Sequence, residues 1–216
     1  MSLTLYFHPL SSFCQKVLTA LYENGTPFTP HLVDLGDAAS RAAFLKIWPI
    51  GKFPVLRDEA RGRTIPESTI IIEYLAQHHP GRTQLVPADP ELALQTRLWD
   101  RFYDLSVDVP MQKIVTDRLR PLAQRDTIGV EQATALLRTA CDIVDGEMAG
   151  KTWAVGDVFT MADCAAAPAL YYANEVMPLR AAHRHAAAYL DRLMQRPSFA
   201  RAAAEAEPYR HLFPRE

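Results

Sequence analysis

Residues 79–90, HPGRTQLVPADP, divide the chain into two parts with different hydrophobic patterns. This segment is rich in proline and poor in periodicity, which is typical of a linker between domains. Before it, short apolar runs alternate with helical patterns; after it, every pattern is helical. We therefore expect an α/β domain over residues 1–78, a linker, and an all-α domain over residues 91–216.

The first part begins with LTLYF at residues 3–7, an apolar and β-prone run. A helical pattern follows and ends at Gly25, where a C-terminal cap is expected. Pro30 places the next strand, at residues 28–35, near a sheet edge, because proline cannot donate to the ladder. The full predicted order is strand, helix, strand, helix, strand, strand, helix, which is typical of a small α/β sandwich.

The second part begins at Asp89-Pro90-Glu91, which combines a capping carboxylate with a proline at the first helical position. Thr160 and Asp163 have the spacing of a capping box and predict the start of a later helix. Two stripes run along the helix that starts at Pro90. They are Leu94, Leu98, Phe102, Leu105 and Val109, and beside them Trp99, Tyr103, Ser106, Pro110 and Ile114.

The composition excludes several classes of function. The 216 residues carry 23 basic and 25 acidic side chains, so the concentrated basic surplus of a nucleic-acid-binding protein is absent. No apolar run approaches the length of a membrane span, and the N-terminus has no signal-like leader. Three scattered cysteines do not form a disulfide framework, so we expect a cytoplasmic protein. His183 and His185 diverge on a predicted helix, and we expect no metal site.

Ser11 and Ser12 stand where the first strand gives way to the first helix. A helix N-terminus exposes unpaired N–H groups and a partial positive charge, so it favours a bound anion. Either serine can be a simple N-cap, or its hydroxyl can donate to a bound thiolate. Cys14 lies one turn into the helix, where we expect it to face the core as a structural residue.

Two further features complete a groove for a small peptide. Pro54 follows Phe53 at the start of a strand, which makes this peptide bond a candidate for the cis form. In that form, the N–H and C=O of Phe53 would face outward and pair with an extended peptide. Glu67 suits an ammonium group, and the Ser68 hydroxyl at the start of the next helix suits a carboxylate.

Four segments resemble the cytosolic glutathione S-transferase family, in order and across essentially the whole chain. They are LYFHPLSSFCQKVLTAL, WPIGKFPVL, IPESTIIIEYL and VGDVFTMADCAAAPAL. The resemblance implies a thioredoxin-like domain that binds glutathione and a helical domain that supplies the pocket for a second substrate. It also implies a homodimer, a role in detoxification, and conjugation of glutathione to small electrophiles with no metal.

The resemblance also assigns residues. The activating serine falls on Ser11, with Ser12 as its substitute if the turn is shifted by one residue. The cis-proline and its peptide-pairing neighbour fall on Pro54 and Phe53, and the γ-glutamyl contacts on Glu67 and Ser68. Lys52 is either a contact to the glycyl end of glutathione or a solvated loop lysine.

The subclass implied is a serine-type bacterial member of the theta, delta or zeta kind. Phe13 stands where the isomerising zeta-like members carry a cysteine, and Trp48 replaces an asparagine common in the family. The alternatives are a glutathione-binding or protein-interaction module with little catalysis, and a glutathione-dependent isomerase or thiol reductase acting through Cys14.

The second-substrate pocket is expected between the loop before the first helix and the long helix of the second domain. Its predicted lining is Leu10, Trp99, Tyr103, Ser106 and Pro110. The competing interpretation is that this stripe packs against other helices or a dimer partner. Pro110 is also expected to bend its helix.

Overall fold

The computed structural model describes residues 2–214. Its first part has the predicted order of elements: β1 (Leu3–Phe7), α1 (Ser12–Glu23), β2 (Thr29–Leu32), α2 (Ala38–Ile47), β3 (Val55–Asp58), β4 (Arg63–Pro66) and α3 (Ser68–His78). The second part is helical throughout: α4 (Pro90–Phe102), η1 (Tyr103–Asp108), α5 (Val109–Asp117), α6 (Thr127–Glu147), α7 (Met161–Val176), α8 (Arg184–Gln195) and α9 (Pro197–Ala206). Short 3₁₀ turns span Leu122–Gln124, Met148–Gly150, Leu179–Ala181 and Glu207–Leu212.

The four strands form one mixed sheet in the order β2-β1-β3-β4. β1 runs parallel to β2 and antiparallel to β3, and β3 pairs antiparallel with β4. Leu5 in β1 is opposite Pro30 on one side and Leu56 on the other. The edge position predicted for the strand that contains Pro30 is confirmed, because β2 has a neighbour on one side only.

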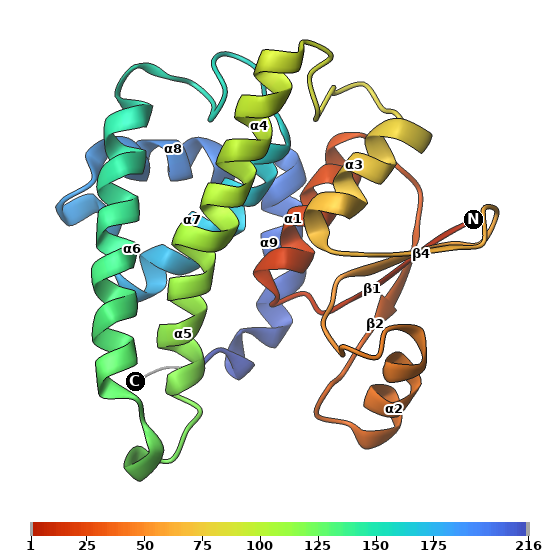
Figure 1. Cartoon of the computed structure of the whole chain (residues 1–216), viewed down its shortest axis with the longest axis horizontal. Helices are drawn as coiled ribbons and strands as arrows, with labels where there is room; N and C mark the ends of the chain where they lie inside the picture. The colour runs from red at the N-terminus through yellow and green to blue at the C-terminus, as the bar shows by residue number, and fades with distance from the viewer. Residues whose placement is uncertain (1, 215–216) are drawn as a thin grey trace.

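Helix α1 is buried on every side. It lies between the sheet and the helical part of the molecule, where it packs against α3, α7 and α9 (Figure 1). Each residue from Cys14 to Leu21 is buried, including the polar Gln15 and Lys16. A helix enclosed in this way has a fixed N-terminus, and that end carries Ser11.

The other face of the sheet is covered by α2. Phe44 from this helix packs with Val33 and Val55, and this small cluster extends to Trp48 and Phe53. The loop after α2 is therefore anchored by apolar contacts on the same side of the molecule as the start of β3.

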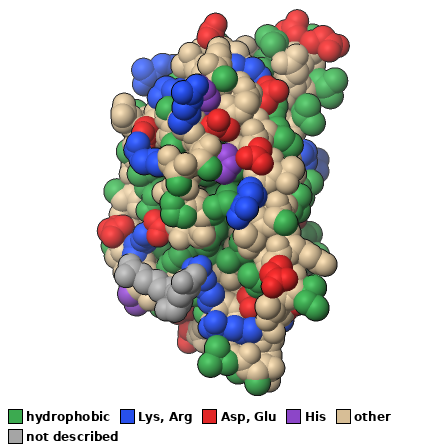
Figure 2. Space-filling model, turned by 90° about the vertical axis from the view of Figure 1, so that its left-hand side faces the viewer, with side chains coloured by type: hydrophobic (Ala, Val, Ile, Leu, Met, Phe, Trp, Pro, Cys, Tyr) green, Lys and Arg blue, Asp and Glu red, His purple; other side chains and the backbone are tan. Residues whose placement is uncertain are grey.

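Local signals in the second part are also confirmed. Asp89 caps α4 by accepting a hydrogen bond from the Leu92 N–H at 2.9 Å. Thr160 and Asp163 form the predicted capping box at the start of α7. On the α6 side of the molecule, basic and acidic side chains are interspersed among hydrophobic ones (Figure 2). Among the described helices, none is long and apolar enough to cross a membrane.

Between α4 and α5 lies a six-residue π-helix, η1, which the sequence did not predict. A π-turn contains more residues than an α-turn, so it rotates every later side chain around the helix axis. Pro110, expected to bend the helix, sits in the first turn of α5 directly after η1. This rotation decides which side chains reach the candidate site.

Candidate functional site

Ser11 is the N-cap residue of α1. Its Oγ accepts a hydrogen bond from the Cys14 N–H at 3.3 Å, and its own N–H donates to the His8 carbonyl at 3.0 Å. The hydroxyl acts only as an acceptor in this cap, and its hydrogen has no acceptor among residues 2–214. The capping role and a donor role toward a ligand are therefore compatible in one side chain.

Backbone N–H groups at the start of α1 also favour an anion beside Ser11. The first N–H groups of α1 belong to Ser12 and Phe13, which lie too early in the helix to have an intrahelical acceptor. Together with the helix dipole they give the entrance of α1 a partial positive charge. An anion placed beside Ser11 would meet a hydroxyl hydrogen and this charge together.

Ser12 faces the helical domain instead. It is 5% exposed, and its hydroxyl donates to Asp108 Oδ2 at 2.9 Å. Gln112 Nε2 donates to the same carboxylate at 3.0 Å and to Ser12 Oγ at 3.3 Å. Burial raises the pKa of Asp108 to about 7. The Ser12 hydroxyl hydrogen is thus already used in a hydrogen bond to Asp108 of the helical part. The geometry therefore favours Ser11 over Ser12 as a donor to a ligand.

Cys14 is fully buried and forms no disulfide. Burial raises the pKa of its thiol to about 12, despite the hydrogen bond with Ser11. A nucleophilic cysteine needs access and a thiolate, and this side chain has neither. The expectation that Cys14 is a core residue agrees with its place in the structure.

A polar cleft of about 220 Å³ contains the other predicted glutathione contacts. Its lining includes Lys52, Phe53, Pro54, Glu67 and Ser68. The loop after α2 supplies the first three, and the start of α3 supplies the last two. The loop after α2 and the start of α3, which the β3–β4 hairpin separates in the sequence, therefore line the same cleft.

The backbone of this cleft is shaped for a ligand that forms main-chain hydrogen bonds. The Phe53–Pro54 peptide bond is cis, as the sequence suggested. Among the described residues, the N–H and C=O of Phe53 have no backbone partner. Lys52 beside it is exposed and lines the same cleft. An extended peptide could pair with Phe53 as a short added strand.

Glu67 has an unusual backbone conformation. Its φ is 69°, and it is the one described residue other than glycine with a positive φ. Such a conformation costs about 1–3 kcal/mol and persists where the surrounding fold enforces it. It places Glu67 immediately before α3, whose first N–H groups and buried Ser68 lie at the cleft. A carboxylate suits these donors, and an ammonium group suits the exposed Glu67 side chain.

An apolar pocket of about 390 Å³ adjoins the polar cleft. Both cavities are lined by Phe53 and Gln112, and Ser11 lines the apolar one. Ser11 therefore lies near the junction of a polar and an apolar cavity, where a thiol bound in the first could meet a second molecule in the other.

The lining of this apolar pocket differs from the lining predicted for the second-substrate pocket. Leu10 lines the pocket, but Trp99, Tyr103, Ser106 and Pro110 do not. Tyr103 is 1% exposed and packs into the core, and the Trp99 ring packs against it. The wall instead consists of Met111, Gln112, Val115, Thr116 and Leu119, with Tyr172 and the C-terminal Leu212, Phe213 and Pro214. The π-helix contributes for the residues that follow its start, such as Pro110, because the predicted stripe assumed uninterrupted α-helical spacing.

A buried ion cluster near the cleft was also missed by the sequence analysis. Lys16 is 1% exposed, and its Nζ lies 2.6 Å from Asp100 and 2.7 Å from Asp104. The same nitrogen donates to Thr69 of α3 at 3.0 Å, and Arg101 also contacts Asp104. The cluster ties α1, α3 and α4 together beside the cleft. A sequence pattern gives no sign of it, because lysine is normally exposed.

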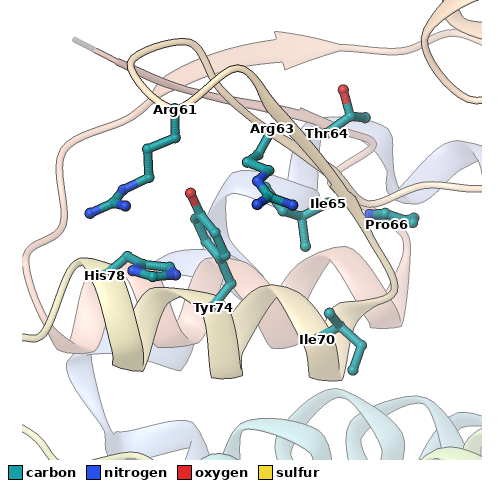
Figure 3. A pocket seen from close by; sticks show the side chains of 8 residues that line it. All are labelled: Arg61, Arg63, Thr64, Ile65, Pro66, Ile70, Tyr74 and His78. Carbon is teal, nitrogen blue, oxygen red and sulfur yellow. The ribbon is translucent and has the colours of Figure 1, made fainter.

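A separate cavity of about 630 Å³ lies between β4 and α3 (Figure 3). Arg61, Arg63 and His78 surround it, Tyr74 stands between them, and Ile70 lies at its other end (Figure 3). The Tyr74 hydroxyl donates to Asp58 at 2.9 Å. This cavity shares no lining residue with the cleft or the apolar pocket.

Comparison with known proteins agrees with this geometry. The glutathione S-transferase N-terminal domain model matches residues 5–83, and the C-terminal domain model matches residues 127–192. Glutathione S-transferase 3 of Zea mays is 31% identical over 214 residues, which cover 94% of this chain and 93% of the maize protein. The chain belongs to the glutathione S-transferase family. Its fold is therefore a thioredoxin-like domain followed by an all-α domain.

Other proteins resemble the chain to a similar degree. A glutathione S-transferase from Methylobacillus flagellatus with glutathione bound is 25% identical at a TM-score of 0.85, covering 94% of this chain and 99% of that one. One from Methylobacterium radiotolerans, in complex with glutathione sulfonate, is 28% identical at a TM-score of 0.82, covering 93% and 94%. A probable maleylacetoacetate isomerase from Caenorhabditis elegans is 30% identical over 79% of this chain and 78% of that protein.

Proposed function

We propose that this glutathione S-transferase conjugates glutathione to small electrophiles and that Ser11 stabilises the glutathione thiolate. The observation that carries the proposal is the Ser11 hydroxyl. It caps α1 as an acceptor, keeps its hydrogen free, and lies near the junction of the two cavities. Glutathione would occupy the polar cleft and the electrophile the apolar pocket.

The required energy is within reach of this arrangement. A free thiol near pKa 8.5 is only about 3% ionised at pH 7. Lowering its pKa by ~2 units takes roughly 2.7 kcal/mol of preferential stabilisation of the anion. One hydrogen bond to a charged group supplies about 1.5–3 kcal/mol, and a helix N-terminus adds about 0.3–1 kcal/mol. Ser11 and α1 together are sufficient, with no general base and no metal.

The remaining contacts follow the polarity of glutathione. Its γ-glutamyl carboxylate would accept from Ser68 and the first N–H groups of α3, and its ammonium group would meet Glu67. Its cysteinyl backbone would pair with Phe53, beside Pro54. Lys52 would contact the glycyl carboxylate from the exposed end of the cleft.

Three alternatives have less support. The resemblance to isomerising zeta-like members implies a cysteine at position 13, where this chain has Phe13. A thiol reductase would need the buried Cys14 to ionise, and burial raises its pKa to about 12. A binding module without catalysis has no need of a free donor at Ser11 next to an apolar pocket.

We further propose a cytoplasmic homodimer. Several large apolar side chains on the outer side of α3, α4 and the segment after it are exposed: Ile70, Leu94, Leu98, Leu105 and Val109. Exposed large apolar side chains that recur along a helix are typical of a protein interface, and a second copy would cover them. Sedimentation equilibrium at micromolar concentration would give twice the chain mass. A monomer mass at all concentrations would contradict the dimer.

Formation of the conjugate tests the function itself. Purified protein, glutathione and a panel of small electrophiles are incubated near pH 6.5, where the uncatalysed reaction is slow, and products are measured by mass. The proposal expects enzyme-dependent glutathione conjugates with saturation in both substrates. Binding of glutathione with no conjugate from any electrophile would favour the binding-module alternative.

A further inference from the structure

The apolar pocket beside Ser11 has few side-chain groups able to donate a hydrogen bond. Those of its described lining residues that carry a hydroxyl or amide are Ser11, Ser12, Gln112, Thr116 and Tyr172. Ser12 donates to Asp108, and Gln112 Nε2 donates to Asp108 and to Ser12. The Thr116 hydroxyl donates to the Gln112 carbonyl at 2.7 Å. These three residues have no donor left for a ligand, whereas Ser11 and Tyr172 remain.

The neighbours of Tyr172 fix the direction of its hydroxyl. Gln15 Nε2 lies 2.9 Å from the Pro9 carbonyl and 2.9 Å from Tyr172 Oη. A carbonyl can only accept, so the Gln15 amide must present its nitrogen on this side, and Tyr172 receives a hydrogen bond from it. The Tyr172 hydrogen has no acceptor among residues 2–214 and is directed away from Gln15.

Tyr172 is held firmly in this position. The residue is 2% exposed, and its ring stacks on Phe213 with centroids 5.5 Å apart. Burial raises the pKa of Tyr172, so the hydroxyl keeps its hydrogen at any physiological pH. Gln15 lies one turn after Ser11 in α1, and Pro9 lies two residues before Ser11. Tyr172 is therefore tied to the same turn that carries the proposed thiolate donor.

We propose that Tyr172 donates a hydrogen bond to an oxygen of the second substrate, and that the pocket favours α,β-unsaturated ketones and aldehydes. This inference rests on the proposed conjugation of glutathione. One free hydroxyl would serve the sulfur and the other the electrophile, and the remaining lining is mainly apolar, as suits an uncharged substrate.

The reaction step uses both donors. The thiol loses its proton to solvent, and the thiolate sulfur forms a bond to the β-carbon of the substrate. The electron pair of the carbon–carbon double bond moves toward the carbonyl, and negative charge develops on the oxygen. Tyr172 stabilises this enolate oxygen through its O–H. Water then returns one proton to the α-carbon, so the adduct contains the atoms of the thiol and the enone.

Paired substrates and paired variants test the assignment. Tyr172→Phe removes the hydroxyl and keeps the ring, and Tyr171→Phe makes the same change one residue earlier on α7, outside the pocket lining. kcat/KM is measured for benzylideneacetone, which develops an enolate, and for benzyl bromide, which releases bromide. Tyr172→Phe is expected to lose at least about tenfold with benzylideneacetone and less than about twofold with benzyl bromide. Tyr171→Phe is expected to change neither by more than about twofold.

A second variant distinguishes loss of the hydrogen bond from misfolding of the Tyr172→Phe protein. Gln15→Met leaves Tyr172 in place but removes the donor that orients it, so a loss with benzylideneacetone alone is expected. An equal loss with both substrates in either variant would overturn the inference, as would a wild-type protein that conjugates benzyl bromide but not benzylideneacetone. Wild-type protein that conjugates neither would overturn the proposed function, and the inference with it.

Discussion

Replacing Ser11 with alanine removes the one side-chain donor that the account places beside the glutathione sulfur. Loss of a hydrogen bond to a charged group costs about 1.5–3 kcal/mol, which raises the pKa of the bound thiol by about 1–2 units. At pH 6.5 about half of the bound thiol is ionised in wild type, so the fraction of bound thiolate, and with it kcat/KM, should fall by about five- to fiftyfold. The deficit should shrink above about pH 9, where the thiol ionises without help.

The same substitution also removes the cap of α1, because Ser11 Oγ accepts from the Cys14 N–H. Loss of a cap costs about 0.5–2 kcal/mol of stability. Asp89→Ala is the matched control, since Asp89 caps α4 through the same kind of bond and does not line the cleft. It should lose similar stability and leave the pH profile unchanged.

The assay is kcat/KM between about pH 5.5 and pH 10 for wild type, Ser11→Ala, Ser11→Thr and Asp89→Ala. Ser11→Thr retains a hydroxyl and should keep most of the activity at low pH. If Ser11→Ala keeps the wild-type pH profile, or if Asp89→Ala shifts it equally, then Ser11 is a cap and nothing more.

Three other changes test separate parts of the account. Cys14→Ala should retain conjugation within about threefold, measured as kcat/KM, because this thiol is buried; loss of activity without loss of stability would favour a cysteine mechanism. Glu67→Gln should raise the Kd for glutathione about tenfold in calorimetry by removing one charge-assisted contact, and an unchanged Kd would exclude the ammonium contact. Burial raises the pKa of Asp108 to about 7 in the folded protein, compared with about 3.9 in the unfolded chain. The folded state therefore holds this proton more tightly, and the free energy of unfolding falls as the pH rises between these two values. Asp108→Asn should flatten that fall in urea midpoints measured at about pH 5 and pH 8; a fall as steep as in wild type would assign the pH dependence to another group.

The sequence predicts the structure well wherever an element is determined by residues close together in the chain. Helix α3 ends at His78 and helix α4 begins at Pro90, so the segment between them lies inside the stretch predicted as a linker. Ser11 at a strand-to-helix turn and the capping box of α7 are determined by residues a few positions apart, so patterns within one segment suffice to find them.

The wall of the apolar pocket could not be predicted in the same way. The six-residue π-helix η1 rotates the side chains of α5, so Met111 and Val115 reach the pocket in place of Ser106 and Pro110. Pro110, which lacks a backbone N–H, was the one local signal that regular hydrogen bonding changes near this point. It indicates a disturbance but not its size.

Contacts between the two domains could not be predicted from sequence patterns either. Lys16 is buried between Asp100 and Asp104, and the Ser12 hydroxyl is committed to Asp108. Each pair joins residues more than eighty positions apart, and a lysine or a serine in a helix gives no periodic sign of its partner. The role of Ser12 therefore became clear only from the three-dimensional arrangement.

The most direct test of the central claim is the ultraviolet absorbance of the thiolate of glutathione bound to the wild-type protein, followed against pH. Bound glutathione is expected to ionise about 2 pH units below free glutathione, because the Ser11 hydroxyl and the N-terminus of α1 stabilise the anion. A thermal shift that shows glutathione bound, together with a thiol that ionises as it does in free solution, would contradict it.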